Sequence, residues 1–192
     1  MKPTLAAVRF ALQDFRAKPE RAPGASPAAV ALILLEGPQG LETLLIRRAE
    51  RADDPWSGQV ALPGGRRDPA DADLLVTAIR ETREETGVDL SAAERLGVLD
   101  DLYPRTSTLP PVVVRPFVFA LAYRPTLVPG VEAARVFWLP LARLSQRGVR
   151  RDLTLVVHGV ERTFPAYVID ETVIWGMTER ILTPFLRLIN QV

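Results

Sequence analysis

Three glutamates, Glu81, Glu84 and Glu85, stand at positions i, i+3 and i+4 of a segment with helical character. With about 100° of rotation per residue they fall on one arc of roughly 100° beside an apolar stripe, while Arg80 and Arg83 point another way. Like charges at this spacing repel one another, and the end of a helix where they lie disfavours anions. A hard divalent cation with oxygen ligands, Mg²⁺ or Mn²⁺, would offset that repulsion.

The same residues also have an interpretation without a metal. On an ordinary solvated helix face, Arg80 would pair with Glu84 at i, i+4 and the other glutamates would point into water. Two neighbours favour the cation. The segment Pro63-Gly64-Gly65 has a flexible backbone that can approach a ligand and offer a carbonyl, and Gly87 ends the helix just past the glutamates.

The composition restricts the chemistry to oxygen and nitrogen groups. The chain has 192 residues, no Cys and one His, so thiolate nucleophiles, disulfides, thiolate-ligated zinc and multi-histidine metal sites are excluded. The one histidine, His158, reads as part of a tight hairpin turn. The net charge of +1 argues against a nucleic-acid partner, although 22 of the 24 basic residues are Arg. We therefore expect carboxylates, hydroxyls, Arg, backbone groups and a bound metal to carry any reaction.

The stretch from Gly65 through residues 80–88 resembles the Nudix box, the signature of hydrolases that split nucleoside diphosphates linked to another group. The box reads Gly, five residues, Glu, seven residues, then Arg-Glu-(apolar)-x-Glu-Glu-x-Gly-(apolar). Gly65 lies one residue further from Arg80 than this pattern asks. Asp71 stands where the first Glu falls when counted from Gly65, and Thr82 occupies the apolar slot. The geometry of the three glutamates is unaffected.

A narrower resemblance covers most of the chain. Residues 44–49 and 58–65 are similar to the motif that precedes the box in the coenzyme A pyrophosphatase subfamily. Similar late segments are residues 132–141, 164–167 and 174–178. The motif has an Arg where this chain has Asp54, and Arg51 would take its place after a shift of one residue.

The resemblance implies roles for the acidic helix. Glu81 and Glu85 would be the principal ligands of Mg²⁺ or Mn²⁺, with Glu84 a further ligand or a partner of the ligands. A backbone carbonyl of Gly64 or Gly65 would complete the set, and Arg80 would orient the carboxylates.

For the general base and the substrate contacts, the resemblance implies several candidate residues. Family members use either a glutamate of the box, here Glu84, or one on a distant loop, for which Glu132 is the candidate. Residues expected to contact the substrate are Arg47, Arg48, Arg51 and Ser107, of which the arginines would bind phosphate oxygens.

Three functions are consistent with these residues. The first is hydrolysis of coenzyme A to 3′,5′-ADP and 4′-phosphopantetheine, as the subfamily implies. The second is the same chemistry on another nucleoside diphosphate derivative, such as ADP-ribose or NADH. The third is a nucleotide-binding module without catalysis, against which the intact set of glutamates argues.

The elements that position these residues indicate an α/β (α+β) fold, a mixed β-sheet between helices. The central helix is expected to begin at Asp68 as N-cap, with Pro69 in its first turn and Asp71 near its positive end. Outer helices are expected over residues 4–17, capped by Thr4, and 175–190, kinked or split by Pro184. Strands are expected over residues 28–35, 41–48, 96–99, 112–121, 136–139, 153–157 and 160–169.

The organisation predicted is one Nudix-type domain over residues 1–192. Residues 1–27 would form the N-terminal helix and a linker, and residues 175–190 the C-terminal helix. The longest charge-free apolar stretch is too short to cross a bilayer, and no secretory signal stands at the start, so a soluble cytoplasmic protein without a membrane partner is expected. The oligomeric state is left open.

Overall fold

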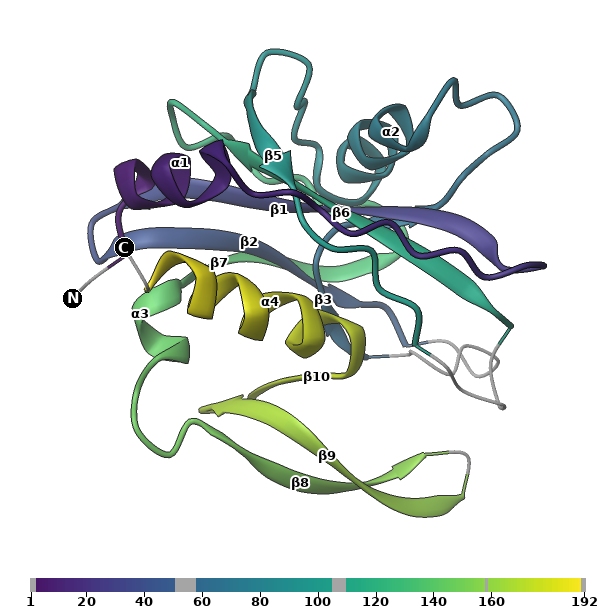
Figure 1. Cartoon of the computed structure of the whole chain (residues 1–192). Helices are drawn as coiled ribbons and strands as arrows, with labels where there is room; N and C mark the ends of the chain where they lie inside the picture. Colours follow the sequence, from purple (N-terminus) through teal and green to yellow (C-terminus); the bar gives the residue numbers. More distant parts are fainter. Residues whose placement is uncertain (1–2, 51–57, 105–109, 158, 191–192) are drawn as a thin grey trace.

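The computed structural model describes residues 3–50, 58–104, 110–157 and 159–190 (Figure 1). The elements are α1 (Leu5–Gln13), β1 (Ser26–Gly37), β2 (Gly40–Arg48), β3 (Val60–Ala61), β4 (Gly64–Arg66), α2 (Leu74–Thr86), β5 (Glu94–Val98), β6 (Val112–Ala120), β7 (Ala133–Pro140), α3 (Leu141–Leu144), β8 (Arg150–Val157), β9 (Val160–Ile169), β10 (Thr172–Trp175) and α4 (Gly176–Ile189). Within these residues no helix is both long and apolar enough to span a membrane.

Seven strands form the main sheet, with the order β3-β2-β1-β6-β5, β4 paired to β1 and β7 paired to β2. The β1–β6 pair is parallel and its neighbours are antiparallel, so the sheet is mixed, as predicted. The turn between Gly37 and Gly40 closes the antiparallel β1–β2 hairpin that the sequence indicated. In this sheet β1 is central, and β4 brings the glycine segment of the box alongside it.

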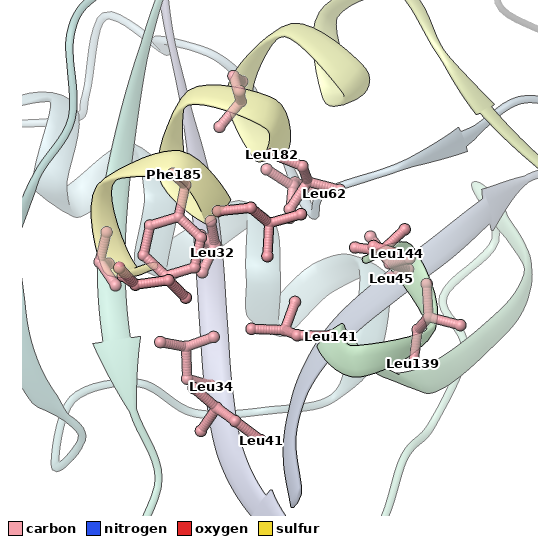
Figure 2. Close-up of a cluster of buried hydrophobic side chains, with 14 of the residues drawn as sticks. Leu32, Leu34, Leu41, Leu45, Leu62, Leu139, Leu141, Leu144, Leu182 and Phe185 are labelled. Carbon is pink, nitrogen blue, oxygen red and sulfur yellow. The ribbon is translucent and has the colours of Figure 1, made fainter. Parts of the chain in front are cut away.

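The two faces of β1 are covered by different helices, because successive side chains of a strand point to opposite sides. Ala29, Ala31 and Ile33 pack with the apolar stripe of α2. Leu32 and Leu34 pack with α4 and α3 on the other face, where Figure 2 shows them among buried leucines and Phe185. The predicted sandwich of helices around a mixed sheet is confirmed.

A smaller sheet of order β10-β9-β8 lies beside α4, with β8 and β9 at the outer side (Figure 1). Buried Glu179 links α4 to this sheet by accepting a hydrogen bond from Arg150 of β8 at 2.9 Å. Glu179 also accepts one at 2.7 Å from the hydroxyl of Thr183 on the same helix. The antiparallel β8–β9 pair is the predicted hairpin, and His158 in its turn lies outside the described residues.

Several predicted boundaries are wrong. The central helix begins at Leu74 with Asp73 as its N-cap, not at Asp68 with Pro69, because the Asp73 carboxylate accepts from the Val76 amide at 2.9 Å and the chain before it forms turns. Asp71 therefore lies in a loop and not at a helix end. The N-terminal helix does begin after Thr4, but it ends at Gln13.

Two further differences concern the outer segments. The predicted linker is shorter than expected, because Ser26 already pairs with Val112 in the sheet. Of the two effects expected of Pro184, a kink or a split, the split is absent, because α4 is continuous through this residue. Pro184 is exposed, as is Arg180 four residues earlier, so the carbonyl that loses its partner lies on the solvent side of the helix.

Candidate active site

The three glutamates of α2 have very different environments. Glu85 is buried, with 3% of its surface exposed, and Glu81 is largely buried. The Glu84 side chain is 59% exposed. The expected Arg80–Glu84 pair is present at 3.1 Å, so the solvated-face interpretation holds for Glu84. It fails for Glu81 and Glu85, whose carboxylates are turned away from bulk water.

The glycine segment before the helix meets these two buried carboxylates directly. The Gly64 amide donates to Glu85 Oε2 at 2.8 Å. A Cβ on Gly65 would lie within 2.6 Å of both Glu81 carboxylate oxygens, and a Cβ on Gly64 would overlap the backbone of β1. Gly64 therefore excludes any side chain, whereas a methyl group at Gly65 would have to displace the Glu81 carboxylate. The glycine backbone does approach the acidic site, through an amide.

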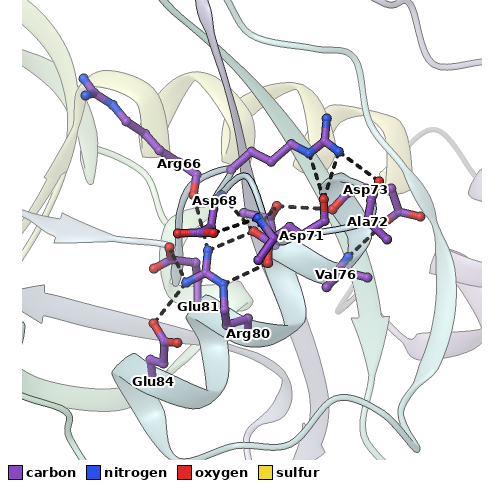
Figure 3. A network of polar contacts seen from close by, with 12 residues as sticks. Arg66, Asp68, Asp71, Ala72, Asp73, Val76, Arg80, Glu81 and Glu84 are labelled. Carbon is purple, nitrogen blue, oxygen red and sulfur yellow. Dashed lines mark hydrogen bonds and ion pairs between the residues drawn. The ribbon is translucent and has the colours of Figure 1, made fainter.

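Arg80 connects the helix carboxylates to the preceding loop (Figure 3). Its guanidinium binds Asp71 through Nε and Nη2, each at 3.0 Å, and its Nη1 lies 2.9 Å from Glu81 Oε1. The helical wheel placed Arg80 away from the glutamates, and this is wrong for its charged end because the long side chain reaches back to them. Arg80 is therefore placed to orient the carboxylates of Glu81 and Glu84.

Asp71 is the residue whose role the sequence interpretation missed. It is 4% exposed, and besides Arg80 it accepts from the Thr77 hydroxyl at 2.9 Å and the Asp68 amide at 3.0 Å. The bond to Arg80 holds the pKa of Asp71 well below its usual range and raises that of Arg80. The available signal was the count from Gly65, which reaches Asp71 at the position of the first box Glu. The extra residue of the loop separates Asp71 from Arg80 in sequence without breaking their contact.

Burial dominates the electrostatics of the other two carboxylates. It raises the pKa of Glu85 to about 7, against the Gly64 amide and Arg48, which lower it. The pKa of Glu81 is also raised by burial, against its bond to Arg80. The negative charge of Glu132 adds to both rises.

Glu132 reaches this place through backbone contacts. Its carbonyl accepts from the Ala49 amide at 2.8 Å, and the Gly130 amide donates to the Glu85 carbonyl at 3.0 Å. The structure therefore brings the predicted distant glutamate to the end of α2 that carries the box glutamates.

The arginines of β2 point in different directions. Arg48 is near enough to Glu85 to affect its pKa. Arg47 instead donates to the Glu171 carbonyl at 3.2 Å, in the β9–β10 turn. A β-bulge between Arg47 and Arg48 separates their registers against β7. Of the other two predicted contacts, Arg51 and Ser107 both lie outside the described residues.

The donor set is suited to a hard divalent cation. Among the described residues no three acidic or histidine side chains already converge on one point, and Glu81 is turned to Arg80. However, Glu81 and Glu85 are two desolvated carboxylates one helical turn apart, with a third acid nearby, and burial is the main cause of their raised pKa values. Such groups favour a cation with oxygen ligands, so the residues present fit one.

Known proteins match the chain in sequence and in fold. Residues 25–157 match the NUDIX domain family. The human mitochondrial coenzyme A diphosphatase NUDT8 is 35% identical over 84% of this chain and 69% of its own length. An uncharacterized Schizosaccharomyces pombe protein, C14C4.10c, is 36% identical over 65% of the chain, which spans 40% of that protein.

A solved MutT/nudix family protein from Enterococcus faecalis superposes with a TM-score of 0.61 at 24% identity, covering 97% of this chain and 70% of that one. This likeness shows a shared fold. Together with the sequence matches, it confirms the family and the class of enzyme that the box indicated. The chain belongs to the Nudix family of pyrophosphohydrolases.

Proposed function

We propose that the chain hydrolyses the diphosphate linkage of coenzyme A to 3′,5′-ADP and 4′-phosphopantetheine, with Mg²⁺ or Mn²⁺ as cofactor. The observation that carries the proposal is the 35% identity to a coenzyme A diphosphatase over 84% of the chain. The subfamily motif in residues 44–49 and 58–65 supports it independently of the box.

Glu81 and Glu85 are the proposed principal metal ligands, because both are desolvated and lie one turn apart beside Gly64. Gly64 is proposed to add a backbone oxygen, and Glu84 to act as a further ligand or as a partner of the ligands. A divalent cation bound there supplies neutralisation of the phosphoryl oxygens and helps to orient water. Arg80, fixed by Asp71, keeps the carboxylates of Glu81 and Glu84 oriented.

The reaction adds one water across the diphosphate. The water oxygen bonds to one phosphorus, the bridging P–O bond breaks, and the second phosphate leaves with the electron pair, while a base takes the water proton. Glu132 is the preferred base, because it lies near both ligand glutamates, whereas Glu84 is held by Arg80 at 3.1 Å. Arg48 is the preferred phosphate contact, since Arg47 is turned to the β9–β10 turn. Arg51 and Ser107 stay predicted contacts.

A substrate screen tests the proposal. The purified chain is incubated with coenzyme A, ADP-ribose, NADH and nucleoside triphosphates under Mg²⁺ and under Mn²⁺, and products are identified by mass. We expect coenzyme A to be the fastest substrate and to give the two phosphomonoesters above. Glu85→Gln should be inactive, while Glu161→Gln on the exposed hairpin should match the wild type.

Each other outcome has a definite meaning. Inert coenzyme A beside rapid cleavage of ADP-ribose or NADH would assign the site to another nucleoside diphosphate derivative. Binding of a nucleotide without turnover of any compound would indicate a module that binds without cleaving.

A further inference from the structure

The loop between β6 and β7, residues 121–132 and here called the strap, crosses the C-terminal end of α2. Its Val128 amide donates to the Thr86 carbonyl at 2.9 Å, and its Gly130 amide to the Glu85 carbonyl at 3.0 Å. Both carbonyls belong to the last turn of the helix, where no amide of the helix itself is left to bind them. The strap therefore caps the helix that carries the box glutamates.

The strap is also fixed at its other end. Its Leu121 amide donates to the Leu34 carbonyl at 2.9 Å, and Arg124 forms an ion pair with buried Glu42 of β2. The strap is thus attached to the sheet on one side and to α2 on the other.

Gly130 is the point of closest approach. A Cβ at this position would lie 2.0 Å from the Glu84 carbonyl oxygen and 3.3 Å from the Glu85 Cα. The obstacle is backbone and not a side chain that could swing aside. Gly130 is not among the residues with positive φ, so an alanine could adopt its conformation. Glycine is therefore required at position 130 because a Cβ does not fit, and not because of its φ angle.

Glu132 follows two residues later and takes its position from this contact. The Ala133 amide donates to the Gly130 carbonyl at 3.0 Å, which closes a tight turn over residues 130–133. The Glu132 carbonyl is held by the Ala49 amide. The carboxylate is therefore carried on a turn whose first residue is pressed against the helix.

We infer that Gly130 is a positioning residue of the enzyme: its missing side chain lets the strap seat directly on α2, and this contact sets where Glu132 stands relative to Glu81 and Glu85. The inference rests on the proposed role of Glu132 as the base. It does not depend on coenzyme A as the substrate, because any diphosphate hydrolysed at this site requires the same placement.

Gly130→Ala is the direct test. To reach even a tight contact of about 3.0 Å, the strap must move away from the helix by about 1 Å, and a misplacement of this size costs about 100-fold in rate. We expect kcat to fall by about that factor with KM little changed. Gly97→Ala is the matched control, because the nearest atoms to a Cβ there belong to Leu12 at 3.6 Å or more and the φ of Gly97 is also not positive. Its kcat should stay within twofold of the wild type.

A double-variant cycle separates positioning from a general effect on the helix. If Gly130 acts through Glu132, adding Gly130→Ala to Glu132→Gln should cost nothing further in kcat. Multiplying effects would overturn the inference, as would a kcat of Gly130→Ala within twofold of the wild type. These rates are measured with whichever diphosphate compound the wild type cleaves fastest, so inert coenzyme A leaves the cycle valid.

Two further measurements complete the test: the first needs no turnover, and the second does not rely on the Gly130→Ala variant. Hydrogen exchange of the amides of residues 128 and 130 should lose protection in Gly130→Ala, and unchanged protection would refute the seating contact. Inserting one glycine between Val131 and Glu132 keeps Gly130 on the helix but moves the carboxylate. It should preserve protection at residue 130 and still lower kcat, and wild-type activity of this variant would contradict the inference.

Discussion

Replacing Asp71 by Asn tests the network that holds Arg80. The carboxylate accepts four hydrogen bonds, two from Arg80 and one each from Thr77 and the Asp68 amide. An asparagine offers one acceptor oxygen and turns an NH₂ group toward donors. Breaking a buried ion pair costs about 3–5 kcal/mol. Arg80 is 30% exposed and keeps its ion pairs with Glu81 and Glu84 in this variant. We therefore expect a smaller loss, about 2–3 kcal/mol of unfolding free energy at pH 7.

The pH dependence of this loss has a definite sign. The pKa of folded Asp71 is depressed by Arg80, so the stability it contributes is present above the usual pKa of an aspartate and is lost as pH falls toward the folded value. The gap between wild type and Asp71→Asn should therefore be constant above about pH 4 and shrink below it. Urea unfolding followed by circular dichroism at pH 7 and pH 3 measures both values.

The control for this experiment is Asp152→Asn on β8, where the side chain is exposed. This variant should unfold within about 0.5 kcal/mol of the wild type, as surface substitutions usually do. The reasoning would be refuted if Asp71→Asn behaved like the control at pH 7, or if its loss were undiminished at pH 3.

Three other predictions concern the buried face of α2. In the presence of a chelator, Glu85→Gln should be more stable than the wild type at pH 8 by up to about 3 kcal/mol, because the raised pKa of Glu85, about 7, makes its charged form costly. That gap should vanish below about pH 4.5, and urea unfolding across pH checks both statements. Thr82→Val should stabilise the fold by about 1 kcal/mol in the same assay, since the buried Thr82 hydroxyl has no hydrogen-bond partner; a destabilised variant would contradict this. Gly65→Ala should lower kcat by about tenfold or more by displacing the Glu81 carboxylate, with a smaller effect on unfolding; unchanged kcat would show that Glu81 accommodates a methyl group.

Local patterns predicted the parts of the fold that local physics determines. The β1–β2 hairpin follows from two apolar runs joined by the turn between Gly37 and Gly40, and α4 follows from its apolar spacing. The two-residue β3 and three-residue β4 are defined only by their partners in the sheet, so periodicity could not reveal them. The start of α2 was misjudged because Asp68 and Asp73 are both good N-caps, and only the turns between them decide which one is used.

In the site, too, the sequence predicted what local geometry determines and missed what depends on the rest of the fold. The spacing of the box glutamates placed them together on α2, because a helix converts spacing into direction. Neighbouring residues of a strand point to opposite faces, so Arg47 and Arg48 must differ, but which of the two faces Glu85 depends on how β2 is placed in the fold. Asp71 and Gly130 act through contacts that only the fold reveals: the sequence placed Asp71 in the first turn of the helix and gave Gly130 no role.

The most direct test of the account is an anomalous difference map from crystals soaked in Mn²⁺. The account predicts a strong peak between the carboxylates of Glu81 and Glu85, next to the Gly64 backbone. Glutamates that stay in their present contacts with no manganese between them, at a concentration that supports catalysis, would contradict it.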